Sequence, residues 1–175
     1  KNSFKNKLDR VSAQMYGNSG MDYATFTMNC IKGDFGIVWP LYADAMKSPR
    51  FDAKEFDRIK QDAINSIKSN ESNPDFAIDK MAKQNAFAGK SYAKDPNGTV
   101  ETVTKLTAAD TKAYWQSIFT RSRMVIVVVG DIEKAVLQEK VTQLLEKVPA
   151  GSPYKQTKSS YTAPANTFKP QPREN

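Results

Sequence analysis

FDAKEFDRIKQDAINSIKSNESNP, residues 51–74, predicts the longest helix of the chain, and the other elements are arranged around it. Asp52 is a good N-cap, and Glu55 three residues later completes a capping-box pattern. Asn73-Pro74 ends the helix, because the residue before a proline is pushed out of the helical region. Apolar residues recur at helical spacing and predict one buried stripe, formed by Phe56, Ile59, Ala63 and Ile67.

Shorter elements precede this helix. Residues 3–12 predict a short helix, and Gln14–Tyr16 with the alternating stretch Tyr23–Ile31 predicts an antiparallel hairpin. The turn between the two strands is expected at Gly17-Asn18-Ser19-Gly20, a cluster of residues that favour turns.

Further helices are predicted over residues 34–47, 74–87, 107–119 and 131–148. Each begins with a residue suited to opening or capping a helix: Asp34, Pro74, Thr107 and Asp131. The loop between the second and third of them contains Asp95-Pro96-Asn97-Gly98, a strong turn signal. Met124–Gly130, MVIVVVG, is apolar throughout and predicts a buried strand with both faces covered.

This order of elements predicts an α+β fold with a mostly antiparallel sheet and helices packed on one face. We expect one domain over residues 1–150. Ser, Thr, Pro, Lys and Gln dominate residues 151–175, which therefore predict a linker or extended tail. The chain does not begin with Met, so we expect it to be part of a longer protein.

Composition removes several classes of chemistry from this segment. There is no histidine and only one cysteine, Cys30, which excludes histidine-based acid–base catalysis, His-containing triads, zinc sites built from His or Cys, and an internal disulfide. A net charge of +7 would suit a nucleic acid, but the lysines are scattered and no nucleic-acid motif is present, so we expect a solvated surface and no nucleic-acid partner. No apolar run approaches the roughly 20 residues of a membrane span.

Four stretches point to a known family by their order. They are LYADAMKSPRF at residues 41–51, EFDRIKQDAINSIKSNESNP at 55–74, FAGKSYAKDPNGTVETVTKLTAAD at 87–110 and RMVIVVVGDIE at 123–133. Together they resemble the pitrilysin/insulinase superfamily of zinc metallopeptidases, which includes the mitochondrial processing peptidases. The resemblance implies a metallopeptidase half-domain of the pitrilysin/processing-peptidase type that lacks its N-terminal strands and its metal-motif helix.

The family's chemistry, as the resemblance implies it, needs an H-x-x-E-H helix and a distant glutamate that together hold zinc. The H-x-x-E-H helix would precede Lys1. The glutamate position falls on Ser66 and a second acidic position on Ile59, and neither a hydroxyl nor an apolar side chain replaces a carboxylate at a zinc site. A histidine of the family is likewise replaced by Ser91. We therefore predict no catalytic and no metal-binding residue in this segment, with zinc restricted to the parent protein.

The main functional hypothesis is a non-catalytic half of such a protease, which shapes a peptide-binding chamber or pairs with a catalytic half. An alternative is part of an active zinc metalloendopeptidase whose ligands lie outside this segment. A third hypothesis, from another class, is a basic binding module that rests on charge alone.

The partners expected under the main hypothesis are a peptide or protein substrate and a second similar domain or catalytic partner subunit. Residues 151–175 look like the interdomain linker of the family, so a second similar domain is expected after them. The compartment is not defined by a targeting signal, and a periplasmic or otherwise exported location is the working guess.

Overall fold

A computed structural model describes residues 2–155 and residue 160. The predicted α+β class is confirmed, with a two-stranded antiparallel sheet in the described residues. The helices are α1 (Asn2–Asp9), α2 (Phe35–Lys47), α3 (Ala53–Glu71), α4 (Pro74–Ala86), α5 (Val100–Lys105), α6 (Ala108–Ile118) and α7 (Lys134–Leu145). The strands are β1 (Gln14–Ser19) and β2 (Ala24–Asn29), and short 3-10 turns lie at η1 (Lys32–Asp34), η2 (Ser91–Ala93) and η3 (Arg121–Arg123).

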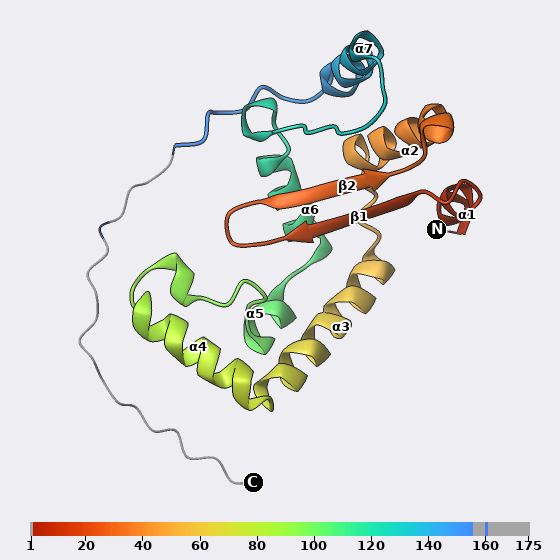
Figure 1. The fold of residues 1–175 in the computed structure, drawn as a ribbon. Helices are drawn as coiled ribbons and strands as arrows, with labels where there is room; N and C mark the ends of the chain where they lie inside the picture. Colours follow the sequence, from red (N-terminus) through yellow and green to blue (C-terminus); the bar gives the residue numbers. More distant parts are fainter. Residues whose placement is uncertain (1, 156–159, 161–175) are drawn as a thin grey trace. The chain divides into compact units, whose positions relative to one another are not determined.

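The described chain falls into two compact units. The first holds the residues up to Ile59 together with residues 106–155, and the second holds residues 60–105. Helix α3 belongs to both, because the division falls between Ile59 and Lys60. The hairpin and helices α1, α2, α6 and α7 are in the first unit (Figure 1).

The predicted hairpin is present, but β1 is longer than the sequence predicts. Gln14 pairs with Asn29 and Ser19 with Ala24, so residues 17–19 belong to the strand and not to the turn. Gly17 stands opposite Phe26, and a Cβ at Gly17 would come within 3.2 Å of the Phe26 ring. The ring therefore occupies the space that a side chain would fill, which explains why a glycine is compatible with this strand.

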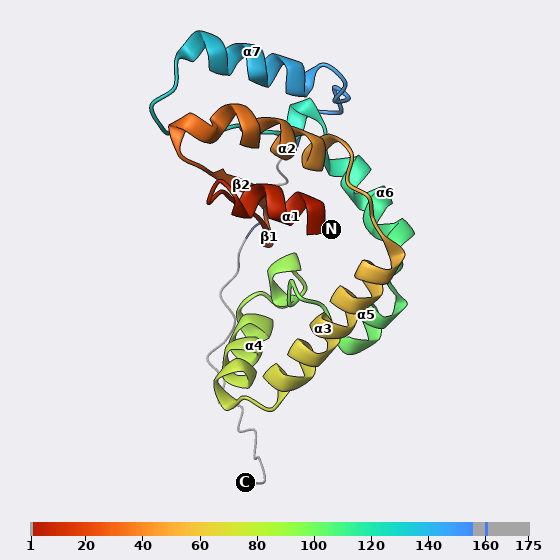
Figure 2. The same cartoon turned by 90° about the vertical axis from the view of Figure 1, so that its right-hand side faces the viewer.

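One face of the hairpin carries the core of the first unit. Phe26 and Met28 lie on the same side of β2, since alternate residues of a strand point the same way. Met28 packs against residues of α2 and α7, and the Phe26 ring meets Trp115 of α6 edge-on at 5.0 Å between ring centroids. Helices thus cover one face of the hairpin, as predicted, and Figure 2 shows α7 running alongside α2 on the side away from the strands.

The core consists of two small clusters. Leu8 of α1 and Ala13 pack with Val38, which is completely buried, while Trp39 packs with Ala43 of the same helix and Leu144 of α7. Val38 and Trp39 are adjacent in α2, so this helix serves both clusters at once.

Helix α3 begins as predicted, but its buried face differs from the predicted stripe. The backbone N–H of Glu55 donates to Asp52 Oδ1 at 3.0 Å, which confirms the N-cap. Ile64 and Ile67 are buried, whereas the side chain of Ile59 is 56% exposed, so its assignment to the buried stripe is wrong. At about 100° per residue, Ile59 lies roughly 80° around the helix from Ile67 and 140° from Ile64, which places it outside the face that packs.

The second unit contains the rest of α3 with α4 and α5. Asn73 caps α4, since its side-chain oxygen accepts from the backbone N–H groups of Asp75 and Phe76 at 2.9 and 3.5 Å. Lys60 Nζ donates to the carbonyl of Thr104 at 3.3 Å and so ties α3 to α5.

Two predicted helix caps differ from the structure. Asp34 is the N-cap residue of α2, as predicted, but its side chain makes no cap hydrogen bond, and residues 32–34 form a 3-10 turn that leads into the helix. Asp131 does not cap α7, which begins at Lys134; its carboxylate instead pairs with Lys32 at 2.8 Å.

The largest departure from prediction concerns residues 124–129. They are neither a strand nor buried: the side chains of Val125, Val127 and Val129 are 88%, 78% and 93% exposed. Between the described residues the segment makes one backbone hydrogen bond, from Met124 N–H to the carbonyl of Arg121 at 3.4 Å. The physical reason is that β1 and β2 pair only with each other, so this segment has no strand beside it.

The predicted division into a domain of residues 1–150 and a tail stays a prediction, because most of residues 151–175 lie outside the described range. Within that range, no helix is both long and apolar enough to cross a membrane.

The predicted capping motif of α6 is confirmed in both directions. Asp110 N–H donates to Thr107 Oγ1 at 3.2 Å, and Thr107 N–H donates to Asp110 Oδ2 at 2.9 Å. The hydroxyl and the backbone N–H of Thr107 hold the pKa of the Asp110 carboxyl below its ordinary value, because both stabilise the carboxylate.

Leu144→Ala should destabilise the chain by about 2–5 kcal/mol, because it removes a buried side chain from the contact between α2 and α7. Urea unfolding followed by tryptophan fluorescence measures the change, since Trp39 belongs to the same cluster. Leu106→Ala is the matched control: Leu106 is 46% exposed, and its loss should cost at most about 1 kcal/mol. Equal losses in the two variants would contradict the assignment of the core.

Asp110→Asn should lower the melting temperature at neutral pH, because it removes the carboxylate that caps α6. The native pKa lies below the ordinary value of 3.8, so the stabilisation is complete above that value and disappears as the pH falls through the native pKa. Thermal unfolding between pH 7 and pH 2 should show the two proteins converging in acid. Asp57→Asn, an exposed carboxylate of α3, is the control, and a gap that widens in acid argues against this cap.

Candidate functional site

Ser66 occupies the position where the sequence resemblance implies a zinc-binding glutamate. It lies in α3 with an exposed side chain, and its Oγ donates to the backbone carbonyl of Asp62 at 3.0 Å. This is the common bond from a helical serine to the carbonyl four residues before it. The hydroxyl is neutral and its proton is used within the helix, so Ser66 offers no charge to a cation.

Ile59, the second position of the resemblance, is exposed on the same helix two turns earlier. The nearest acidic residues, Asp62 and Glu71, are also exposed. Within the described residues, no group of three or more His, Cys, Asp or Glu side chains is arranged to hold a metal ion. That this segment holds no metal ligand and no catalytic group stays a prediction, because its test is a measurement of metal content and activity.

Three further side chains that could react, those of Cys30, Tyr42 and Ser91, are placed within the fold and not in a catalytic arrangement. Burial, with the nearby charge of Asp34, raises the pKa of the Cys30 thiol, so the thiolate is disfavoured and the sulfur is a poor nucleophile. Burial also raises the pKa of Tyr42, whose hydroxyl donates to the carbonyl of Phe26 at 2.9 Å and fastens α2 to the hairpin. Ser91, at the family's histidine position, opens the 3-10 turn η2, and the ring of the adjacent Tyr92 lies 5.7 Å from that of Phe87.

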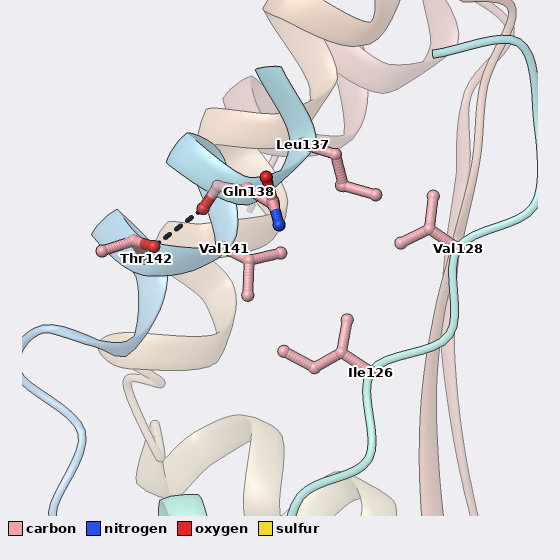
Figure 3. Close-up of a pocket in the computed structure, with 6 residues that line it drawn as sticks. All are labelled: Ile126, Val128, Leu137, Gln138, Val141 and Thr142. Carbon is pink, nitrogen blue, oxygen red and sulfur yellow. Dashed lines mark hydrogen bonds between the residues drawn. The ribbon is translucent and has the colours of Figure 1, made fainter. Parts of the chain in front are cut away.

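An open apolar groove lies between residues 124–129 and α7, with a volume of about 480 Å³. Ile126 and Val128 point across it toward Leu137 and Val141, as Figure 3 shows. The polar side chains at its edge are Gln138 and Thr142, and the Thr142 hydroxyl donates to the carbonyl of Gln138 at 2.8 Å. The lining residues include no acid or base, and the one hydroxyl, that of Thr142, is bonded within α7, so the groove is suited to packing and not to a reaction.

An ion pair joins the end of this segment to the hairpin. Asp131 Oδ2 lies 2.8 Å from Lys32 Nζ, and Lys32 follows β2 by three residues. Both side chains are largely exposed, so the pair contributes little to stability, but it holds the end of residues 124–129 close to the end of β2.

Two comparisons with known proteins point to the same family of peptidases. Residues 105–174 match a family profile described as "Peptidase M16 inactive domain". The fold matches the crystal structure of a peptidase M16 inactive domain from Pseudomonas fluorescens with a TM-score of 0.81, 18% identity and coverage of 94% of this chain and 39% of that one. Over residues 105–174 the chain is similar to the M16 peptidase inactive domain, and its fold is that of the solved domain. The predicted resemblance to the pitrilysin/insulinase proteases is thereby confirmed.

Curated relatives of this chain carry divergent names. It is 25% identical over 113 residues to a "Non-peptidase homolog YmxG" of Helicobacter pylori, and 21% identical over 132 residues to an "Uncharacterized zinc protease YmxG" of Bacillus subtilis. These alignments cover 65% and 75% of this chain but only 26% and 32% of the relatives, so the chain spans about a quarter to a third of their length.

A second solved structure shares the fold. The periplasmic protease PqqL of Escherichia coli matches with a TM-score of 0.70 and 15% identity, over 90% of this chain and 18% of that one. At 15–18% identity, the similarity to these structures shows the fold alone, so any chemistry has to be argued from the residues of this chain.

The sequence identifies the two positions of α3, Ile59 and Ser66, but it does not predict the exposed groove. A signal for it was present: a strand that is apolar on both faces needs neighbouring strands, and the sequence predicts only a two-stranded hairpin besides it.

Ile59→Glu and Ser66→Glu, each restoring an acid at a position implied by the family, should both fold with a change of about 0.5 kcal/mol or less in unfolding free energy. Both positions are exposed on α3, and glutamate is a good helix former. Ile67→Glu is the matched control, since the same change one residue beyond Ser66 buries a charge and should cost several kcal/mol. Thermal melts followed by circular dichroism compare the three, and tolerance of Ile67→Glu would show that the buried face is misassigned.

Proposed function

We propose that this chain is part of a non-catalytic half of an M16-type protein, which shapes a peptide-binding chamber or pairs with a catalytic half. The proposal rests on the chemistry of α3. The sequence resemblance implies a zinc-binding glutamate at the position of Ser66, and the Ser66 Oγ instead donates to the Asp62 carbonyl at 3.0 Å. The proposed segment therefore binds no metal and performs no hydrolysis, while it keeps the fold of the family.

The proposed ligand is a peptide or protein in extended conformation. The hairpin face opposite the helices carries polar and hydroxyl side chains from both strands: Gln14, Tyr16, Asn18, Thr25 and Thr27. In a two-stranded antiparallel sheet, the outward backbone groups of each strand are also available for a further strand. Addition of an extended peptide to such an edge is an established mode of peptide recognition.

The proposed setting is an exported protein with a second similar domain or a catalytic partner subunit. Support for export comes from the periplasmic location that the name of PqqL gives for that protein. Support for a partner domain comes from coverage, because this chain spans only part of the relatives and structures that it matches.

The competing function is an active zinc metalloendopeptidase whose ligands lie outside residues 1–175. The name of the Bacillus subtilis relative, a zinc protease, favours this reading. It attributes catalysis to other parts of the protein and leaves Ser66 without a role in metal binding.

The test is the zinc content of the intact protein, measured by elemental analysis for the natural sequence, Ser66→Ala and Ser66→Glu. We expect Ser66→Ala to change neither zinc content nor peptidase activity, because the hydroxyl is not a ligand. Loss of stoichiometric zinc in Ser66→Ala would contradict the proposal. Zinc that is unaffected by Ser66→Ala, together with chelator-sensitive cleavage of an unfolded peptide substrate, would instead establish the competing function.

A further inference from the structure

Two backbone hydrogen bonds link the stretch that follows α7 to the 3-10 turn η3, which follows α6. The N–H of Arg121 donates to the carbonyl of Pro149 at 2.9 Å, and the N–H of Ser122 donates to the carbonyl of Ala150 at 3.0 Å. Both N–H groups stand at the start of the turn, where a helical turn offers them no partner of its own. Carbonyls from beyond α7 therefore complete the hydrogen bonding of η3.

A side chain adds a third hydrogen bond to this contact. The Ser122 hydroxyl donates to the carbonyl of Ser152 at 2.9 Å, although the two residues are 30 positions apart in the chain. The contact lies at a packed corner, since the neighbouring side chains of Val148 and Thr120 are 4% and 7% exposed. Opening the contact would break three hydrogen bonds and expose two buried side chains, so it is more stable than a surface loop.

Gly151 is the residue that permits the close approach. Its φ of +69° lies in the left-handed region, which strains residues with a side chain. A Cβ at this position would also overlap the Cβ and Oγ1 of Thr120 and lie 2.9 Å from Ser122 Oγ. The contact therefore requires a glycine for two separate reasons, the backbone conformation and the available space.

The helices on either side connect this contact to the core of the first unit. Helix α6 meets the hairpin through Trp115, and α7 packs against α2 through Leu144. The contact joins the segments that follow these two helices, so a chain that leaves from it starts at a fixed point of the unit.

We propose that residues 149–152 are a latch, which ties the start of the predicted linker to η3 and thereby fixes how the domain after the linker is held. The linker is predicted to begin at Gly151, which lies inside the latch. Gly151 and Ser122 are positioning residues in this proposal: the first allows the approach and the second holds it.

The orienting role rests on the proposed function, because it assumes a second similar domain after the linker. The latch itself rests on contacts between residues 120–122 and 148–152, and it does not depend on whether the protein binds zinc.

Hydrogen exchange of the intact protein, natural and Gly151→Ala, tests the latch. The amides of Arg121 and Ser122 should exchange at least about tenfold faster in the variant, because the added Cβ displaces the carbonyls that they bind. Gly89→Ala is the matched control, since Gly89 has a φ of +74° but nothing within 4 Å of the place of its Cβ. It should leave both amides unchanged. Unchanged amides in Gly151→Ala would overturn the proposal.

The amide of Leu144 in α7 distinguishes release of the latch from unfolding of the unit, and its exchange should stay the same. If Gly151→Ala also exposes this amide, Ser122→Ala decides in its place, because it removes only the hydroxyl that bonds to Ser152. The amides of Arg121 and Ser122 should again exchange faster, and their full protection in Ser122→Ala would overturn the latch.

Small-angle X-ray scattering of the intact protein tests the orienting role. With the latch released, the two domains sample more relative positions, so the radius of gyration should increase in Gly151→Ala and stay at the natural value in Gly89→Ala. Equal radii in all three proteins, with the amides of η3 released, would overturn the orienting role. The zinc measurement on Ser66→Ala is independent of this result and decides the proposed function separately.

Discussion

The first unit depends on a single feature of α2, namely that two adjacent residues are buried in different directions. Val38 packs toward α1, and Trp39 packs toward α7. Met28 of β2 touches both clusters, so the hairpin is held where they meet. Because side chains in such a core are closely packed, a change in α2 is felt by the hairpin and by both neighbouring helices. This double contact ties α1, α7 and the hairpin to α2, while α6 meets the hairpin through Trp115.

Local signals predicted most of the fold, and failures arose where a residue depends on a distant partner. The capping motif of α6 is predicted correctly because its two residues lie three positions apart. Gly17 was assigned to a turn because its compatibility with a strand comes from the Phe26 ring on the neighbouring strand. Ile59 was assigned to the buried face because periodicity does not show which side of a long helix finds a neighbour.

At the candidate site, too, the sequence shows which side chains are present, whereas their exposure and hydrogen bonds depend on the fold. That α3 offers a serine and an isoleucine instead of acids is visible in the sequence alone, because a side chain's chemistry does not depend on its neighbours. The exposure of these two residues and the bond from Ser66 to the Asp62 carbonyl required the structure. Helix α3 packs through Ile64 and Ile67, which lie on a different face from Ile59, so its burial does not depend on the side chain at either position.

The exposed segment 124–129 has a consequence for aggregation during synthesis of the protein. Short, β-branched, uncharged runs are the stretches from which fibrils and aggregates nucleate, and this one has no partner strand among residues 2–155. Arg121 and Arg123 precede it and Asp131 follows it, all three exposed. Charged residues that flank an aggregation-prone segment act as gatekeepers, because like charges oppose the stacking of identical chains. Arg121, Arg123 and Asp131 are thus expected to oppose aggregation of the chain while it is being synthesised.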